Sequence, residues 1–362
     1  MVEATAAAVQ LPGSRRLAAL GVTVEDDGGE DLTDRRQFME AMAAAGTSAA
    51  VLYRRLAVAH PDQLTVEEME ADLDGIAATY MATPHSVMFP RILAGWRQAE
   101  EFLEGRGGLK VRRQVTSFAG RYGFYLARLA LNTGDDETAR RFGMLAFQHG
   151  DDADDALLTG TVAGLRSSLA YFAGTFQTAA EIAAAARPTA DPYARARLAA
   201  FEARAWAALG DETRTRHALD AMADDLFTVP QFGEPPFDDE AVAGFTAVAL
   251  SRLGEGTEAE PHARRSITIL EEQGIRRPED YGGSLAALAT ALLNRPKPDP
   301  EEAARIMGRT LDLLASYPTR TVLHRAHEVA AQLDPYATLP VVADVRERLH
   351  HVRPLLALPA AR

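Results

Sequence analysis

The sequence predicts an all-α fold, a tetratricopeptide-like α-solenoid of antiparallel helix hairpins. Three observations lead to this prediction. Hydrophobic residues make up 47% of the 362 residues and aromatic residues only 7%, so the apolar content rests mainly on alanine and leucine, which are strong helix formers. Helix start and stop signals recur along the chain, and no stretch has the pattern of a strand. Helices that end at glycine repeat at a nearly constant period.

Composition divides the chain into three parts. Residues 1–33 are predicted to be a flexible N-terminal segment, because the stretch 25–31 is acidic, contains two glycines and has little to bury. Residues 34–353 are predicted to form a single tetratricopeptide-like helical-repeat domain, and residues 354–362 a C-terminal tail. The proline-containing stretch 229–237 interrupts the helical pattern, which resumes directly afterwards. We therefore expect it to be a long loop between repeats.

Helix starts are marked by polar residues with defined spacing. Thr65 followed by Glu68 has the pattern of a capping box, in which each side chain satisfies a free backbone N–H of the first turn. Asp299 is followed by proline and then by Glu302, and Asp191 also precedes a proline. Proline is favoured at the first helical position because its missing N–H would have no partner there.

Four glycines mark the predicted turns between paired helices: Gly134, Gly174, Gly210 and Gly254. They are separated by 40, 36 and 44 residues, close to the period of about 34 residues in a tetratricopeptide unit. In such a unit, small residues are needed where the two helices cross, five positions after the glycine and seven before it. These positions hold Ala139, Ala179, Thr215, Ala259, Ala127, Ser167, Ala203 and Ala247.

Several classes of site are excluded or disfavoured. The chain has no cysteine, which excludes disulfides, zinc–thiolate sites, iron–sulfur clusters and a cysteine nucleophile. Its nine histidines do not form a metal-ligand set, and no catalytic motif is present, so we expect no metal, no cofactor and no assigned catalytic residue. The glycine-rich stretch 105–108 lacks the Gly-Lys-Ser/Thr ending of a phosphate loop and is predicted to be an inter-helix turn.

Charge and hydropathy bear on partners and location. The net charge of −13 disfavours binding to nucleic acid, because phosphate contacts need clustered basic residues. No stretch approaches the roughly 18 apolar residues of a membrane span, and no signal peptide is evident. We expect a cytoplasmic protein without a membrane partner. Apolar residues in the C-terminal stretch 341–358 suggest a possible homodimer contact.

The chain resembles the tetratricopeptide-repeat sensor region of actinobacterial Xre-type transcriptional regulators. The stretches that carry the resemblance are 34–38, 80–84 continuing into 90–93, 133–135, 207–211 and 317–323, and together they span residues 34–349. The family pattern places a DNA-binding helix-turn-helix domain ahead of this region. Only about 33 residues precede it here, so the expectation is a truncated chain, a stand-alone sensor or a relative recruited to another task, without direct nucleic-acid binding.

A tetratricopeptide superhelix has a concave groove lined by the first helix of each hairpin. Projecting the repeat onto the sequence places nine candidate ligand-binding residues in that groove: Arg121, Phe124, Arg128, Asn132, Ser168, Tyr171, Arg197, Arg204 and Arg252. Arginine presents a planar fork of donors suited to carboxylate or phosphate. The groove is therefore predicted to bind a peptide or small anionic ligand. The alternative is that these arginines pair with acidic residues of neighbouring repeats.

Four further aromatic residues, Trp96, Tyr122, Tyr125 and Trp206, have helical spacing that favours a place in the core over stacking on a ligand. The leading functional hypothesis is a ligand- or peptide-binding regulatory protein that controls transcription or specialised metabolism through a protein partner. One alternative is a scaffold that binds a precursor peptide or carrier protein in a biosynthetic pathway. Another is an enzyme with a pocket evolved on the repeat fold, because fold alone does not determine function.

Overall fold

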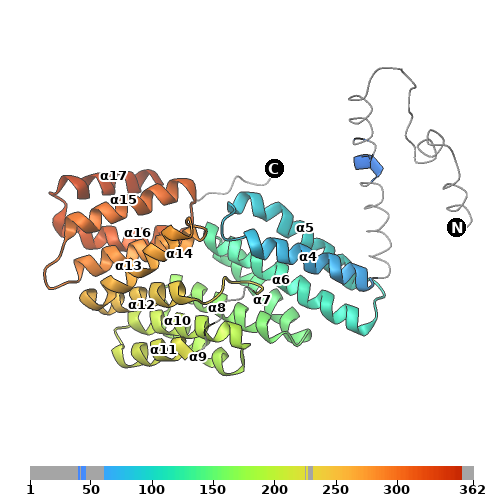
Figure 1. Cartoon of the computed structure of the whole chain (residues 1–362). Coiled ribbons are helices and arrows are strands. Elements are labelled where there is room, and N and C mark those ends of the chain that lie inside the picture. Colours follow the sequence, from blue (N-terminus) through green and yellow to red (C-terminus); the bar gives the residue numbers. More distant parts are fainter. Residues whose placement is uncertain (1–39, 41, 46–60, 225, 227–230, 353–362) are drawn as a thin grey trace, which may run out of the picture.

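The computed structural model describes residues 40, 42–45, 61–224, 226 and 231–352. The predicted N-terminal segment 1–33 and C-terminal tail 354–362 lie outside these residues. Figure 1 shows the described helices, and among them there is no strand. Their bounds are α4 Gln63–Thr79, α5 His85–Glu104, α6 Leu109–Thr133, α7 Asp136–Asp152, α8 Ala156–Phe172, α9 Phe176–Ala186, α10 Pro192–Ala208, α11 Glu212–Asp224, α12 Asp239–Leu253, α13 Gly256–Glu272, α14 Pro278–Leu293, α15 Pro300–Ser316, α16 Arg320–Leu333 and α17 Pro340–Val352, with short 3₁₀ turns at Arg187–Thr189 and Asp334–Tyr336.

The helices pack in consecutive pairs, which confirms the predicted fold class. The second helix of each pair lies against the first, as in α6 with α7, α8 with α9, α10 with α11 and α12 with α13. The first helices also contact one another in sequence, from α6 through α8, α10, α12 and α14 to α16. These six helices line the inner, concave face of a superhelix, and their partners cover its outside (Figure 1).

The predicted turns and helix crossings are confirmed in detail. Gly134, Gly174, Gly210 and Gly254 all have positive φ values between 74° and 89°, the left-handed conformation that glycine adopts without steric cost. The eight small residues predicted at the crossings are all 0% exposed. A larger side chain at any of them would push apart two helices whose backbones approach closely.

Helix starts agree with the predictions at two of three sites. Asp299 and Asp191 cap α15 and α10 by accepting hydrogen bonds from the first-turn backbone, and each precedes a proline. The predicted capping box at Thr65 is wrong by three residues. Asp62 is the N-cap of α4, and Thr65 is the third residue of the helix that completes the box. Aspartate and threonine both favour caps, so the local pattern fits two registers.

The superhelix closes on itself, because α16 near the end of the chain packs against α6 near its beginning. The Tyr317 ring meets the His85 ring edge-on, with centroids 5.4 Å apart. Arg320 at the start of α16 forms an ion pair with Asp136 at the start of α7. Asn132 on α6 donates a hydrogen bond of 3.2 Å to the carboxylate of Glu279 on α14. The first and last repeats thus meet across the concave face.

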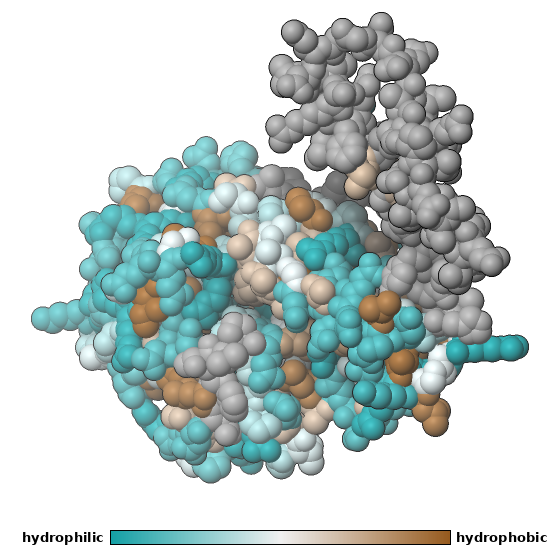
Figure 2. All heavy atoms as spheres, turned by 45° about the vertical axis from the view of Figure 1, so that its right-hand side comes forward, coloured by the Kyte–Doolittle hydropathy of each residue, from teal (hydrophilic) through white to brown (hydrophobic). Residues whose placement is uncertain are grey.

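The core consists of two large clusters, one in the N-terminal and one in the C-terminal hairpins, with smaller clusters between them, and most of the predicted core aromatics are buried. Tyr122 and Tyr125 are each 1% exposed and Trp206 is 8% exposed, whereas Trp96 is half-buried against Phe142. On the face drawn in Figure 2, hydrophilic side chains predominate and hydrophobic ones lie in small separate groups. None of the described helices is both long and apolar enough to cross a membrane.

Candidate functional site

The loop 231–237 lies on the concave face and fills part of the groove. This stretch was predicted to be an inter-repeat loop, but its position was not predicted. Phe232 packs against Phe124 and Tyr125 of α6, with ring centroids 5.5 and 5.4 Å away. The backbone N–H of Gly233 donates to the Tyr125 hydroxyl, and the Tyr193 hydroxyl donates to the carbonyl of Glu234. We call the part of the groove under this loop the covered half.

The predicted arginines of the covered half have partners within the chain. Arg121 forms an ion pair of 2.9 Å with Asp155, the N-cap of α8, and its guanidinium lies 5.0 Å from the Phe232 ring centroid. Arg197 donates to the carbonyl oxygen of Pro235 at 2.9 Å. Phe124 is 0% exposed. For these residues the alternative expectation, internal pairing, describes the structure better than ligand contact.

Arg128 is the most completely paired of the groove arginines. It forms an ion pair with Glu234 of the loop and lies 3.7 Å from Glu279 of α14. Although burial works in the opposite direction, these two carboxylates raise the pKa of Arg128. Glu279 also accepts a hydrogen bond of 2.6 Å from Thr321 and the bond from Asn132. Arg128 and Asn132 therefore serve the closure of the superhelix and border the cavity beside it.

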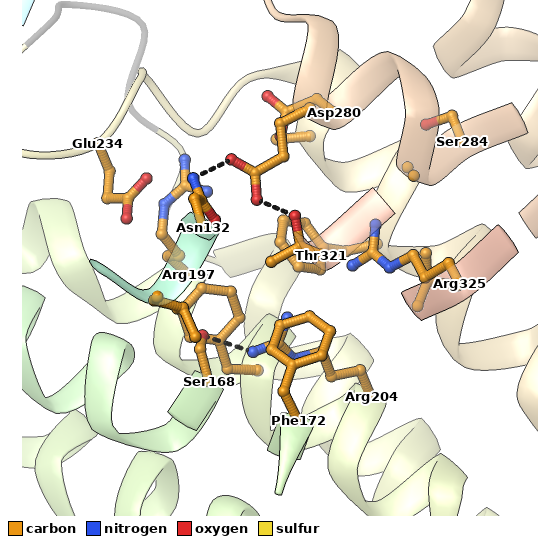
Figure 3. Close-up of a pocket in the computed structure, with 18 of the residues that line it drawn as sticks. Asn132, Ser168, Phe172, Arg197, Arg204, Glu234, Asp280, Ser284, Thr321 and Arg325 are labelled. Carbon is orange, nitrogen blue, oxygen red and sulfur yellow. Dashed lines mark hydrogen bonds between the residues drawn. The ribbon is translucent and has the colours of Figure 1, made fainter. Parts of the chain in front are cut away.

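Next to the covered half lies an open cavity of about 90 Å³ (Figure 3). We call it the central cavity. Its lining comes from α6, α8, α10, α12, α14 and α16, the first helix of every hairpin from α6 onward, with Glu234 of the loop. It continues into a wider groove of about 390 Å³ that includes Tyr171, Arg252 and Glu328. Arg325 and Gly283 line both spaces. The cavity and this groove form the open half of the concave face.

Arg204 lines the central cavity and is only 3% exposed. Its guanidinium donates one hydrogen bond of 2.7 Å to the Ser168 hydroxyl (Figure 3). It also lies 4.1 and 4.6 Å from the ring centroids of Phe201 and Tyr171. No carboxylate among the described residues forms an ion pair with it, and its Nε–H has no hydrogen-bond partner there. A buried charge without a carboxylate partner is unusual because desolvation is costly.

Burial is the main influence on the pKa of Arg204, and its charged neighbours differ in sign, because Tyr171 and Glu279 raise the pKa whereas Arg325 and Arg252 lower it. Burial, together with the positive charges of Arg325 and Arg252, lowers the pKa of Arg204 to about 9, which still leaves it protonated at neutral pH. Arg252 itself pairs with Glu328 of α16, and its guanidinium lies 5.5 Å from the Tyr171 ring centroid. The five predicted residues that the structure brings together in the open half are Asn132, Ser168, Tyr171, Arg204 and Arg252.

Arg325 was missed by the sequence reasoning. It is half-buried on α16 and points into the central cavity, and it has no hydrogen bond or ion pair with any residue that the structure describes (Figure 3). Its guanidinium passes over Gly283 of α14, where an added Cβ would come within 2.1 Å of Nη1. A glycine within a helix and opposite an arginine was the available signal. It was not used because only the hairpins around the four turn glycines were projected.

The acidic side of the central cavity was also missed. Glu240 on α12 is 2% exposed, accepts a hydrogen bond of 2.7 Å from Ser266 and lies 2.8 Å from Nη2 of Arg277. Burial, reinforced by the nearby charge of Asp280, raises the pKa of Glu240 to about 7. Burial also raises the pKa of Asp280, whose closest ion-pair contact is Nε of Arg277 at 3.9 Å. These groups lie in helix first turns, where acidic residues are common for structural reasons.

No group of three or more histidine, aspartate or glutamate side chains with metal-site geometry occurs among the described residues. The lining of the central cavity contains arginine, carboxylate, amide and hydroxyl groups, which suit charged hydrogen bonds. No protein-family model matches this sequence, and a comparison with curated proteins gives no match.

Proposed function

We propose that this chain is a ligand-binding regulatory protein whose central cavity takes a small anionic ligand, and that a partner reads the resulting change in the superhelix. The observation that carries the proposal is Arg204, a cavity-lining guanidinium that is 3% exposed and has no carboxylate partner in the described part of the chain. A bound carboxylate or similar anion would supply the missing charge and the missing acceptor. Charge-assisted hydrogen bonds of this kind are strong when water is excluded.

The position of the cavity supports a regulatory role. Its walls include α6 and α16, which lie far apart in the sequence and pack against each other. Glu279 of α14 links them, because it accepts hydrogen bonds from Asn132 of α6 and Thr321 of α16. A ligand held between them would favour the closed superhelix by the difference between its affinities for the closed and open forms. A partner that recognises one form would then respond to the ligand.

Part of the resemblance to sensor regions falls at this closure. The stretches 80–84, 133–135 and 317–323 lie at the junction of the first and last repeats, where Tyr317 and Arg320 contact residues near positions 85 and 136. Residues shared with regulators would be expected there if opening and closing were the response. Control of transcription or specialised metabolism through a protein partner is therefore the regulatory role we propose.

The structure favours a small ligand over a long peptide. An extended peptide would need the whole groove, but the loop 231–237 already occupies the covered half, with Phe232 only 8% exposed. The loop makes the contacts to Arg128 and Arg197 that a peptide would otherwise make. A scaffold for a precursor peptide is consequently the weaker alternative.

The enzyme alternative has one favourable feature, the raised pKa of Glu240. A carboxyl group with a pKa near neutrality suits general acid–base catalysis. Both carboxylate oxygens of Glu240, however, face Ser266 and Arg277, and among the lining residues no serine lies beside a histidine or lysine that would activate it. Binding accounts for the cavity more fully than catalysis does.

The proposal is tested by comparing two variants of the full-length protein, Arg204→Met and Arg276→Gln, purified from the cells that produce it. Arg276 is exposed and does not line the cavity, so it serves as the matched control. Native mass spectrometry should find an anionic small molecule in the wild type and in Arg276→Gln but not in Arg204→Met. Two results would overturn the proposal. Arg204→Met could retain the ligand as well as the wild type does, or the wild type could bind nothing after incubation with a small-molecule extract of those cells.

A further inference from the structure

The charges around the central cavity separate into an acidic side and a basic side. Four other charged residues of the lining are occupied within the chain: Arg128 lies beside Glu234 and Glu279, and Arg197 donates to the carbonyl oxygen of Pro235. Of the rest, Glu240 and Asp280, from α12 and α14, form the acidic side, and Arg204 and Arg325, from α10 and α16, form the basic side. Figure 3 shows Asp280 above the cavity, Arg204 below it and Arg325 at its flank, with the guanidinium turned inward. The separation matters because the two sides are unbalanced in opposite senses.

The acidic side has more carboxylates than partners. One guanidinium, that of Arg277, serves three carboxyl groups: it lies 3.3 Å from Asp238, 2.8 Å from Glu240 and 3.9 Å from Asp280. Asp280 has the longest of these contacts and borders the cavity. The positive charges of Arg197 and Arg128 also act on Asp280, but its carboxylate accepts no hydrogen bond from the described residues. An ammonium group placed here would supply a charged hydrogen bond.

The basic side has more guanidinium groups than partners. Arg204, Arg325 and Arg252 lie close enough for the latter two to lower the pKa of Arg204. Within the described residues, the one ion pair formed by the three is that of Arg252 with Glu328. Arg204 and Arg325 therefore carry surplus positive charge on the cavity wall.

The central cavity also has apolar walls. Leu165, Phe201, Phe245 and Val248 are apolar residues of the same lining. Binding sites of small molecules commonly combine an apolar lining with a few placed polar groups that fix orientation. Here the polar groups at the two sides have opposite charge, which would orient a ligand whose own ends differ in charge.

From this arrangement we infer that the central cavity binds a small zwitterion, with its carboxylate at Arg204 and Arg325, its ammonium group at Asp280 and an apolar body between them. The inference rests on the proposed function and specifies its ligand class. Short peptides with free termini and ω-amino carboxylic acids both have this chemistry. Neither charge alone would relieve both imbalances, so removing either charge from the ligand should weaken binding.

The test uses the full-length protein and three matched libraries of dipeptides: one unmodified, one N-acetylated and one C-amidated. Acetylation removes the positive charge and amidation the negative charge, while the side chains stay the same. ω-Amino carboxylic acids of four to eight carbons form a separate arm that distinguishes the two sources. Binding is read by native mass spectrometry and quantified by calorimetry for the best binder from either arm.

We expect the best binder to lose about tenfold or more in affinity when either of its ends is capped, since each charged contact is worth roughly 1.5–3 kcal/mol. Asp280→Asn should remove the effect of N-acetylation, and Arg325→Gln should reduce the effect of amidation. Arg276→Gln should leave both the effect of N-acetylation and the effect of amidation on affinity unchanged.

Three outcomes are distinct. Weaker binding of both the N-acetylated and the C-amidated forms of the ligand supports the inference. Equal binding of N-acetylated and unmodified ligands would overturn the zwitterion and leave the anion-binding function intact. No binding in any arm, together with an Arg204→Met variant that behaves as wild type toward the cell extract, would overturn both.

Discussion

The covered and open halves of the concave face are built from the same kind of helix, carry arginines at comparable positions and yet differ in how those arginines are satisfied. In the covered half, Arg121, Arg128 and Arg197 contact a carboxylate or carbonyl of their own chain. In the open half, Arg204 and Arg325 have no carboxylate partner among the described residues. The arginines of the covered half are thus satisfied within the chain, and in the open half only Arg252 has a carboxylate partner, Glu328, among the described residues.

This difference shows that groove position does not by itself define a binding site in a helical repeat. A first-helix arginine on the concave face can be a structural residue when a loop or a distant repeat supplies its counter-charge. We propose that it is a binding residue where it borders a cavity and has no counter-charge within the chain. The predictions below use this contrast, with effects from the largest to the smallest.

The largest expected effect is in the covered half. Phe232→Ala should lower the free energy of unfolding of the ligand-free protein by about 4 kcal/mol, since it removes a buried ring packed on two aromatic residues. The measurement is urea denaturation. Phe147→Ala is the matched control, because Phe147 on α7 is 38% exposed and should cost less than about 1 kcal/mol. Equal costs for both variants would show that the loop does not support the fold.

The second prediction concerns pH and the acidic side of the cavity. The folded-state pKa of Glu240 is raised from 4.5 to about 7, so between these values the folded protein binds more protons than the unfolded chain. Stability should therefore fall as pH rises through this window, by on the order of 3 kcal/mol, and level off above it. Glu240→Gln should lack this loss.

Urea denaturation at a series of pH values from 5 to 8 checks this prediction. Other carboxyl groups titrate in both proteins, so the informative quantity is the difference between wild type and Glu240→Gln. Asp239→Asn is the control, since the Asp239 side chain is 71% exposed and should leave the pH dependence unchanged. If the free energy of unfolding depended on pH in the same way in the wild type and in Glu240→Gln, the raised pKa of Glu240 would be contradicted.

The third prediction compares two adjacent glycines of α14. A Cβ at Gly282 would come within 2.7 Å of the branched side chain of Val322, which has little room to move. Gly282→Ala should therefore lower the free energy of unfolding by about 2 kcal/mol. A Cβ at Gly283 would meet the guanidinium end of Arg325, which can swing aside. Gly283→Ala should leave stability within about 1 kcal/mol and weaken ligand binding about tenfold.

Thermal unfolding and ligand titration of the two alanine variants separate these effects. The pair sharpens the comparison because one glycine serves packing and the other serves the cavity. If Gly283→Ala left ligand affinity unchanged while Gly282→Ala destabilised as expected, Arg325 would not be a binding residue.

The fold was predictable from the sequence because its signals are local. Glycine turns and small crossing residues lie within about 12 residues of each other, and all of the predicted positions are confirmed. The partners of the arginines were not predictable in the same way. Arg128 meets Glu234 from 106 positions away, and Arg320 meets Asp136 from 184 positions away, contacts that depend on how the whole superhelix closes.

Of the candidate site, the sequence therefore predicted the basic residues but not their division into two halves. Arg325 and Asp280 were not predicted because their helices end without one of the four turn glycines. Glu240 lies far from the turn at Gly254, at the start of its helix, where acidic residues are common for structural reasons. The Gly282-Gly283 pair within a helical pattern was the strongest unused signal, since glycine weakens a helix and is kept where something approaches closely.

The most direct test of the central claim is the stability of ligand-free Arg204→Met. Methionine is close to arginine in volume, so the substitution removes the buried charge with little change in packing. It also removes the hydrogen bond to Ser168 and the contacts of the guanidinium with the rings of Phe201 and Tyr171. If Arg204 is an unneutralised charge kept for a ligand, the variant should be more stable than wild type by about 1 kcal/mol in urea denaturation. A loss of about 2 kcal/mol or more would instead show that Arg204 is already satisfied by the protein and that the cavity awaits no anion.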